Sequence, residues 1–214
     1  MEVLIIGASG GAAEISAMLS SVSENVFGHF AIGFLDDQKS LRNSKVYGLS
    51  VLGQVNDFKN WGHVGLISGI GNDTNIASKA KILSRLRDNG ANFINCISSS
   101  AHIMSQVYMS DGVIVSPQCY IGSAVVLESF VHVMPSSTIS HHSSVGFATI
   151  ICSGVSIGGN TSIGSSCYIG IGVTISDHLT ISNNVIVGSG SNVVSDLTIP
   201  GVYYGNPARW IRDV

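Results

Sequence analysis

The fold is decided by residues 139–175, which read ISHHSSVGFATIICSGVSIGGNTSIGSSCYIGIGVTI. In this stretch an aliphatic residue stands at every sixth position. The spacing continues in both directions without a gap, giving the series Ile97, Ile103, Met109, Val115, Ile121, Leu127, Val133, Ile139, Val145, Ile151, Ile157, Ile163, Ile169, Ile175, Ile181, Val187, Val193 and Ile199. So many matches to one period indicate a structural repeat.

The other slots of the repeat agree with a short strand followed by a corner. The residue two before each aliphatic is small or apolar, and the residue after it is often Gly. The next two slots hold turn residues, among them Pro117, Pro135, Asn160 and Asn184. A unit this short cannot bury its aliphatic face alone, so the units must coil and stack.

Hexapeptide repeats of this kind predict a parallel β-helix. Three units close one triangular turn, so residues eighteen apart lie in one column, and adjacent coils are about 4.8 Å apart. The alternative, a flat sheet or a sandwich, would need turn signals about every 8–12 residues.

The composition narrows the class of protein. Hydrophobic residues make up 45% and charged residues 11% of the 214-residue chain, but no uncharged apolar run approaches the length of a membrane helix. The net charge of −3 does not indicate a nucleic-acid-binding protein. No Lys or Arg stands between Arg87 and Arg209, so an anionic ligand of the coil must be held by backbone N–H groups, by the tail, or by another domain or chain.

The four cysteines match no metal spacing and are interpreted as buried small residues in a reducing compartment; they are Cys96, Cys119, Cys152 and Cys167. The N-terminus lacks a basic flank and a long apolar core, so we expect no signal peptide.

Strands and helices alternate before the repeat. We expect strands over 2–6, at a stretch ending in Gly33-Phe34-Leu35-Asp36-Asp37, over 64–68 and over 92–97, and helices over 12–20 and 73–89. The pattern predicts a small parallel α/β domain whose ligands bind at the strand C-termini.

The turn Gly7-Ala8-Ser9-Gly10-Gly11 between the first strand and helix offers backbone N–H groups to a phosphate. The acidic pair Asp36-Asp37 could receive sugar hydroxyls. The turn lacks the dinucleotide fingerprint. A nucleotide or nucleotide-sugar site is the preferred interpretation, and a tight turn that needs Gly for packing is the alternative.

His141 and His142 lie in the corner after Ile139, and Gly159 follows His141 by eighteen residues in the same column. A corner His beside a backbone N–H without a side chain is a candidate base with an oxyanion donor. The alternatives are a surface His pair without a role and, with less support, a zinc site. Phe130, Phe147 and Ile171 put apolar groups in corner slots, which indicates an interface, a ligand groove, or packing against the tail.

The whole chain resembles the bacterial hexapeptide acyltransferases that acetylate nucleotide-linked amino sugars. These are the bacillosamine and perosamine N-acetyltransferases, grouped with the sialic acid O-acetyltransferase-like family. The resemblance covers the coil and five motifs: 7–11, Leu35-Asp36-Asp37, Ile70-Gly71-Asn72, Ile139-Ser140-His141 and 205–209.

The resemblance implies roles by position. His141 is similar to the family's general base, which takes a proton from the sugar amine as that amine attacks the thioester of acetyl-CoA. Gly159 is similar to the backbone donor to the thioester oxygen. Ile150, Ile171 and Ser189 correspond to cofactor contacts. The implied nucleotide-sugar site consists of Ser9, Gly10, Gly11, Asp36, Asp37 and Gly71.

The chain departs from the family pattern in three places. The family usually has Glu or Asp after the base, where this chain has His142, so the orienting acid is missing or comes from elsewhere, with Glu128 and Asp111 as candidates. Ile150 stands where His is frequent, and Gly11 replaces the His of a Gly-His-Gly turn.

The expected fold class is α/β + β: a small N-terminal Rossmann-like βαβ domain (1–95), a left-handed parallel β-helix of hexapeptide repeats (96–200) and a C-terminal tail (201–214). The expected activity is acetyl-CoA-dependent N-acetylation of a nucleotide-linked 4-amino-4,6-dideoxy sugar, a surface-glycan precursor, with no metal. The resemblance also implies a cytoplasmic homotrimer without nucleic-acid or membrane partners. The alternatives are a sugar O-acetyltransferase of the sialic acid type and a non-catalytic β-helix scaffold.

Overall fold

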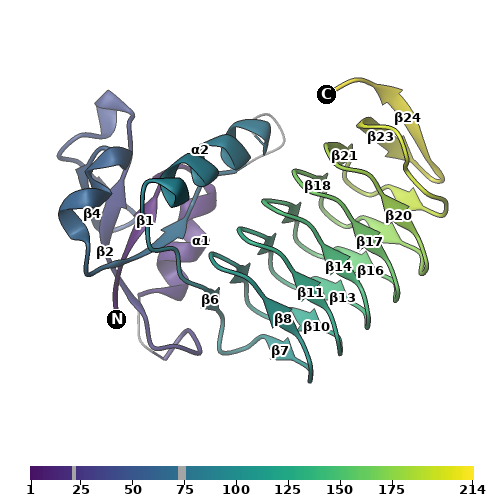
Figure 1. Ribbon diagram of the computed structural model, residues 1–214, viewed down its shortest axis with the longest axis horizontal. Helices are drawn as coiled ribbons and strands as arrows, with labels where there is room; N and C mark the ends of the chain where they lie inside the picture. Colours follow the sequence, from purple (N-terminus) through teal and green to yellow (C-terminus); the bar gives the residue numbers. More distant parts are fainter. Residues whose placement is uncertain (21–22, 72–75) are drawn as a thin grey trace.

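The computed structural model describes residues 1–20, 23–71 and 76–214. An α/β domain lies at the N-terminal end, and a long coil of short strands extends from it to the C-terminus (Figure 1). No helix in the described part of the chain is long and apolar enough to cross a membrane.

The N-terminal domain is built on one five-stranded sheet with the order β3-β4-β2-β1-β5. Its strands are β1 (Glu2–Ile6), β2 (Phe30–Leu35), β3 (Lys45–Val46), β4 (Leu49–Gly53) and β5 (Gly65–Ser68). All pairs are parallel except β3 with β4. The expected strands at 2–6 and 64–68 are confirmed. The strands β3 and β4 were not predicted from the sequence, and neither were two short 3-10 helices, η1 (Lys39–Leu41) and η2 (Val55–Trp61).

Two helices accompany this sheet, α1 (Gly11–Met18) and α2 (Ile76–Asp88). Helix α2 lies within the expected range 73–89, of which residues 73–75 are outside the described part. Its buried face includes Leu83 and Leu86, which pack in the domain, and Ile76, which packs against the core of the coil. This helix therefore joins the two parts of the molecule.

The coil consists of three parallel sheets, one on each side of a triangular turn. The first sheet contains β6 (Cys96–Ile97), β9 (Ile114–Val115), β12 (His132–Val133), β15 (Ile150–Ile151), β18 (Tyr168–Ile169) and β21 (Val185–Val187). The second contains β7 (His102–Ile103), β10 (Tyr120–Ile121), β13 (Thr138–Ile139), β16 (Ser156–Ile157), β19 (Thr174–Ile175) and β22 (Asn192–Val193). The third contains β8 (Tyr108–Met109), β11 (Val126–Leu127), β14 (Ser144–Val145), β17 (Ser162–Ile163) and β20 (Thr180–Ile181).

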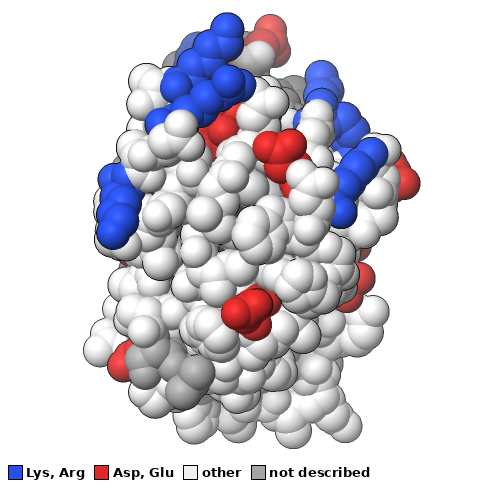
Figure 2. Space-filling model, turned by 90° about the vertical axis from the view of Figure 1, so that its left-hand side faces the viewer, with Lys and Arg blue, Asp and Glu red and all other residues white. Residues whose placement is uncertain are grey.

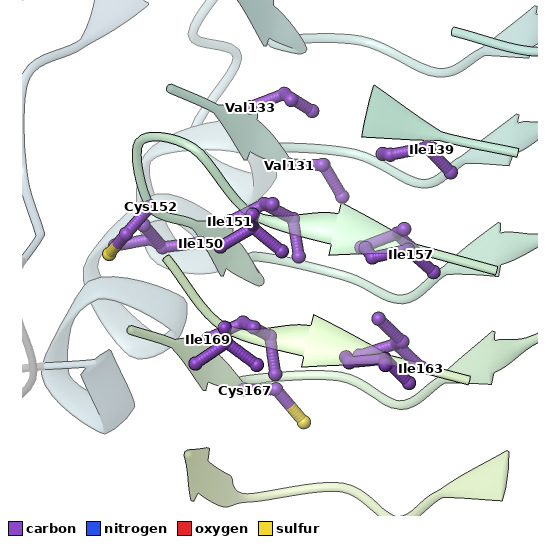
Figure 3. Close-up of a cluster of buried hydrophobic side chains, with 14 of the residues drawn as sticks. Val131, Val133, Ile139, Ile150, Ile151, Cys152, Ile157, Ile163, Cys167 and Ile169 are labelled. Carbon is purple, nitrogen blue, oxygen red and sulfur yellow. The ribbon is translucent and has the colours of Figure 1, made fainter. Parts of the chain in front are cut away.

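The register follows the predicted columns of eighteen. Ile139 of the second sheet pairs with Ile121 on one side and with Ile157 on the other. The repeat aliphatics and the small residues before them fill the interior (Figure 3). All four cysteines are buried, as predicted, and burial raises the pKa of Cys96 to about 12 and that of Cys167 to about 11.

The corners use the left-handed backbone region more widely than Gly and Asn alone would suggest. Positive φ angles occur at Ala124, Phe130, His142 and Asn160, among others. These four residues donate their N–H groups to carbonyls in the preceding coil, as His142 does to Ser123 and Asn160 does to His141, both at 2.9 Å. These bonds between coils stabilise a conformation that is strained for most residues.

The repeat ends earlier than predicted. Ile199 is 60% exposed, and the buried residue that pairs with Ile181 is Leu197, two positions before it. Asp196 accepts the N–H of Thr180 at 2.8 Å and holds this shortened turn. The tail then adds β23 (Gly201–Gly205) and β24 (Ala208–Arg212) to the end of the first sheet.

Phe130 stands in a corner slot, as the repeat predicts, but its side chain is buried and does not form an exposed surface or pack against the tail. Phe130 is 1% exposed, because the N-terminal domain covers this corner. Its ring lies edge-on to Phe93 at 4.8 Å and to Phe147 at 5.5 Å, and the guanidinium of Arg87 lies over both corner rings. We call Arg87, Phe93, Phe130 and Phe147 the aromatic joint. The tail does not form it.

Candidate active site

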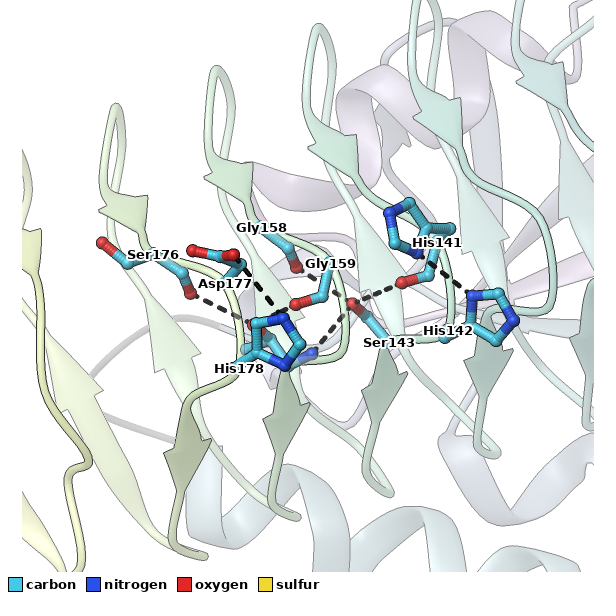
Figure 4. Close-up of polar contacts among 9 residues, drawn as sticks. His141, His142, Ser143, Gly158, Gly159, Ser176, Asp177 and His178 are labelled. Carbon is cyan, nitrogen blue, oxygen red and sulfur yellow. Dashed lines mark hydrogen bonds and ion pairs between the residues drawn. The ribbon is translucent and has the colours of Figure 1, made fainter.

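The candidate base lies at the corner between the second and third sheets, directly after β13. Ile139 points into the core and is fully buried, which leaves His141 and His142 exposed on the outside of the corner. Nδ1 of His141 lies 3.1 Å from Nδ1 of His142, and the two rings are almost perpendicular (Figure 4). Among the described residues, no cluster of side chains suits a metal ion.

Gly159 lies one coil further along the same column, as predicted. A methyl group on this glycine would stand 2.8 Å from Cε1 and 2.9 Å from Nε2 of His141, so the imidazole occupies the space that a side chain would take. In the described residues, the Gly159 N–H has no hydrogen-bond acceptor. In contrast, the N–H of Ser165 at the next corner is capped by Asn183 at 2.7 Å. The structure therefore brings a base and an open backbone donor together.

Two of the three candidate cofactor residues share a different corner, between the first and second sheets. Ile171 is 60% exposed, and Ser189 follows it by eighteen residues in the same column, with the Gly190 N–H bonded to the carbonyl of Ile171. Ile150 does not join them. Its side chain is 3% exposed and packs under Gly71, so no cofactor reaches it in this arrangement.

The candidate sugar-binding residues meet at the carboxyl edge of the N-terminal sheet. Ser9, Gly10 and Gly11 follow β1, while Gly71 follows the adjacent strand β5. Within the described residues, no atom beyond the chain neighbours lies within 4 Å of the place where a Gly10 side chain would begin, so the turn is open on that side as far as the structure describes it. Asn72, which completes the motif Ile70-Gly71-Asn72, lies outside the described residues.

The two acids after β2 have structural partners. Asp36 accepts N–H groups from Ala8 and Gln38, both at 2.7 Å, one on each carboxylate oxygen. Asp37 accepts the N–H of Val55 at 2.9 Å through one oxygen. Asp36 therefore fixes the loops around the glycine turn, whereas the second oxygen of Asp37 accepts no hydrogen bond from the residues that the structure describes.

Sequence reasoning missed a cavity of about 260 Å³ at the end of β4, lined by Arg42, Asn43, Val51, Leu52, Gly53, Gln54 and Asp57. The N–H of Asp36 bonds to the carbonyl of Gly53, so this cavity adjoins the acidic pair. To predict this cavity from the sequence, strand β4 would first have had to be recognised. Arg42 is the one cationic residue in its lining.

Sequence reasoning also missed two buried titratable side chains between α2 and the coil. Lys79 is 2% exposed and donates to the carbonyl of Phe130 at 3.0 Å. Burial lowers the pKa of Lys79 to about 7. Burial and the charge of Lys79 lower the pKa of His132 to about 3. The helical spacing of Lys79 from Ile76 and Leu83 was the available signal, because it places Lys79 on the buried face.

Neither acid proposed to orient His141 lies near it. Glu128 and Asp111 belong to the corner between the third and first sheets, where Glu128 accepts the N–H of Phe147 at 2.9 Å. In one chain the base and the two cofactor candidates Ile171 and Ser189 thus lie along two different edges of the coil, while the glycine turn lies in the N-terminal domain. The cationic side chains are also confined to one region of the surface. On the face that the N-terminal domain presents, Figure 2 shows Lys and Arg in the upper part, and it draws no Lys or Arg in the lower part of that face.

No protein-family model and no curated protein matches the chain. Solved structures do match over nearly its whole length. A histidine-to-alanine mutant of a GDP-perosamine N-acetyltransferase from Caulobacter crescentus, in complex with CoA and GDP-perosamine, has a TM-score of 0.88 and 24% identity, covering 100% of this chain and 98% of that one.

The acetyltransferase domain of PglB from Neisseria gonorrhoeae FA1090, in complex with acetyl coenzyme A, has a TM-score of 0.88 and 22% identity, with 98% of each chain covered. WeeI from Acinetobacter baumannii AYE has a TM-score of 0.69 and 21% identity, covering 99% of this chain and 100% of that one. The chain therefore has the same fold as these three proteins, including both the N-terminal domain and the coil of short parallel strands.

Proposed function

We propose that this protein is an acetyl-CoA-dependent N-acetyltransferase whose acceptor is a nucleotide-linked 4-amino-4,6-dideoxy sugar used as a surface-glycan precursor. The observation that carries the proposal is the imidazole of His141 lying against Gly159, whose N–H has no acceptor in the described residues. Support comes from the fold shared with the acetyltransferase domain of PglB and the perosamine N-acetyltransferase.

The proposed reaction needs a base and an oxyanion donor, and no metal. His141 takes a proton from the sugar amine as the nitrogen attacks the thioester carbonyl. The Gly159 N–H stabilises the negative charge on the carbonyl oxygen. The C–N bond forms, the C–S bond breaks, and the proton on His141 passes to the leaving thiolate of CoA.

We assign the acceptor to the N-terminal domain, residues 1–95, read as a Rossmann-like unit. The turn of Ser9, Gly10 and Gly11 offers N–H groups to the phosphates, Gly71 borders the sugar, and the free oxygen of Asp37 takes a hydroxyl. Asp36 shapes the turn. Residues 96–200 form the acyltransferase unit, a left-handed β-helix, and 201–214 the tail.

The complete enzyme in this proposal is a homotrimer with its sites between neighbouring coils. The base stands on a corner of the coil and the glycine turn in the N-terminal domain, and in this proposal a second copy brings the two together. Exposed apolar side chains on the first coils suit such contacts, including Tyr108 at 61%, Tyr120 at 39% and Met104 at 37% exposure. Acetyl-CoA lies in this proposal along the column of Ile171 and Ser189, and the enzyme works in the cytoplasm.

The test is thiol release from acetyl-CoA across a panel of UDP-, dTDP- and GDP-linked 4-amino-4,6-dideoxy sugars. Release with one of these acceptors, reduced about 10²–10⁴-fold by His141→Ala, is the expected result. The buried cysteines, with raised pKa values at Cys96, Cys119 and Cys167, keep the protein's own thiols out of the assay.

The chemistry of the product decides between the remaining alternatives. An amide survives mild base, whereas an ester on a sugar hydroxyl is cleaved, and sialic acid serves as the hydroxyl acceptor control. Folded protein that neither turns over acetyl-CoA nor binds any nucleotide sugar would be a scaffold, and the proposal would be wrong.

A further inference from the structure

The contact between His141 and His142 defines the state of the proposed base. The two Nδ1 atoms are 3.1 Å apart, which is hydrogen-bond distance, and the ring centroids are 5.2 Å apart (Figure 4). One Nδ1 must carry a proton and the other must not, because two lone pairs or two N–H groups cannot form a hydrogen bond. The contact therefore couples the tautomers of the two rings.

The backbone builds this contact. The His142 N–H donates to Ser123 in the preceding coil, and the His141 carbonyl accepts from Asn160 in the next coil, both at 2.9 Å. His142 has a φ of 57°, which turns its side chain back toward its neighbour. Gly159 gives the His141 ring room on the other side. The pair is thus held from both adjacent coils.

No charged group competes for His141 in the described residues. The adjacent corners present Ser123 and Gly159 to it, and neither side carries a charge. The nearest acid in the same column is Asp177, two coils on or roughly 10 Å away by strand spacing. Asp177 pairs with His178, its Oδ2 lying 3.7 Å from Nε2.

We propose that His142 is the positioning residue for the base: its neutral Nδ1 accepts the Nδ1–H of His141 and so keeps Nε2 of His141 unprotonated. This inference rests on the proposed function, in which Nε2 takes the proton of the attacking amine. When His141 becomes an imidazolium, its Nδ1–H still donates to the lone pair of His142, which stabilises the cation.

The arrangement has a consequence that a carboxylate partner would not have. A proton on Nδ1 of His142 removes the acceptor, and His141 then pairs by accepting at its own Nδ1, which puts its proton on Nε2. His141 then no longer acts as a base, although it is still neutral, because its one proton is on Nε2. Activity therefore needs both rings in their neutral forms.

The backbone of the coil supplies matched variants at this position. Ala124 and Ala148 adopt a φ of 58°, and Asn160 a φ of 53°, in equivalent corner slots, so both Ala and Asn fit where His142 stands. Asn offers an amide oxygen as acceptor but cannot gain a proton. His178, with a φ of 60° in the same slot two coils on, provides the control position.

His142→Ala is expected to lower kcat about 10–100-fold with KM for both substrates unchanged, because the base loses its orientation. His142→Asn restores kcat at neutral pH, because the amide oxygen takes over as acceptor for Nδ1–H of His141. His178→Ala behaves as the wild type. An unchanged kcat in His142→Ala, or no rescue by His142→Asn, overturns the proposal.

Nuclear magnetic resonance of protein labelled with ¹⁵N-histidine tests the same proposal without any substrate. With both rings neutral, His141 is expected in the Nδ1–H form and His142 in the Nε2–H form, and the His141 assignment reverts to a mixture in His142→Ala. The opposite tautomers would contradict the inference even in an active enzyme. Absence of acetyl transfer with the expected tautomers would instead contradict the proposed function alone.

Discussion

The coil and the N-terminal domain place their functional groups by different means. In the coil, one repeated unit fixes every position, so that Ile139 points inward, His141 outward, and Gly159 lies beside it one coil later. In the domain, no period exists, and the glycine turn and the acids meet only because their strands are neighbours in the sheet. A repeat thus determines where a residue points, and a mixed α/β sheet determines which loops meet.

The contact between the coil and the N-terminal domain contains features that neither the repeat nor the sheet explains alone. The aromatic joint fills a corner that the repeat alone would leave exposed, and Lys79 is buried against the carbonyl of that same corner. Neither feature is part of the hexapeptide pattern. We therefore expect the coil to tolerate changes at open corners, while equivalent changes at this corner affect the whole molecule.

The largest effect on stability is expected from Phe130→Ala. Removing a buried ring that contacts Phe93 and Phe147 leaves a cavity in the joint and costs about 3 kcal/mol of unfolding free energy. Urea unfolding followed by circular dichroism measures it. Ile171→Ala, the same kind of change at an exposed corner, is the control and should cost less than about 0.5 kcal/mol. Equal losses would remove the distinction between the two corners.

A smaller effect, confined to activity, is expected from Gly159→Ala. The new methyl group would stand within 3 Å of the His141 ring and displace it, which lowers kcat roughly 10–100-fold while the unfolding midpoint changes little. Steady-state kinetics with the active acceptor measures this. Ser165→Ala, in the equivalent slot of the corner between the third and first sheets, should leave kcat unchanged. Wild-type kcat in Gly159→Ala would show that the imidazole need not lie where it does.

The smallest effect is a pH dependence that arises from Lys79. Its pKa is about 7 when folded and 10.5 when unfolded, so the unfolded chain binds more protons between these values and stability rises with pH. The wild type should gain on the order of 1 kcal/mol per pH unit over Lys79→Met between pH 7.5 and 9.5. Lys81→Met, at an exposed position of the same helix, should run parallel to the wild type. Urea titrations at several pH values provide the comparison, and parallel curves for Lys79→Met would refute it.

The sequence predicts most of the coil because each inward position repeats the same physical requirement. It mispredicts the end of the coil, where the Asp196 side chain makes a shorter turn possible and Leu197 replaces Ile199. The six-residue spacing of the aliphatic residues gives no sign of this hydrogen bond, so the sequence alone does not predict the shorter turn. In the N-terminal domain, β3 and β4 are short and lack a clear alternation, so the cavity beside Arg42 went unrecognised.

The candidate site divides in the same way. The column of His141 and Gly159 follows from the repeat length, and the structure brings the two residues together. The burial of Ile150 and the hydrogen bonds of Asp36 depend on contacts between distant segments, which one sequence does not encode locally. The contact between His141 and His142 is partly predictable. The sequence shows that the two residues are adjacent, but it does not show the left-handed backbone at His142.

Subunit complementation tests most directly whether the coil of one copy acts on an acceptor held by the domain of another. His141→Ala lacks the base, and Gly10→Trp fills the open side of the glycine turn, so each homotrimer alone should show little thiol release. If the protein is the proposed homotrimer, mixed trimers isolated through two affinity tags should recover about a third of the sites, because base and turn then come from different chains. No recovery in confirmed mixed trimers would mean that each chain builds its own site, and it would contradict an active site divided between two copies.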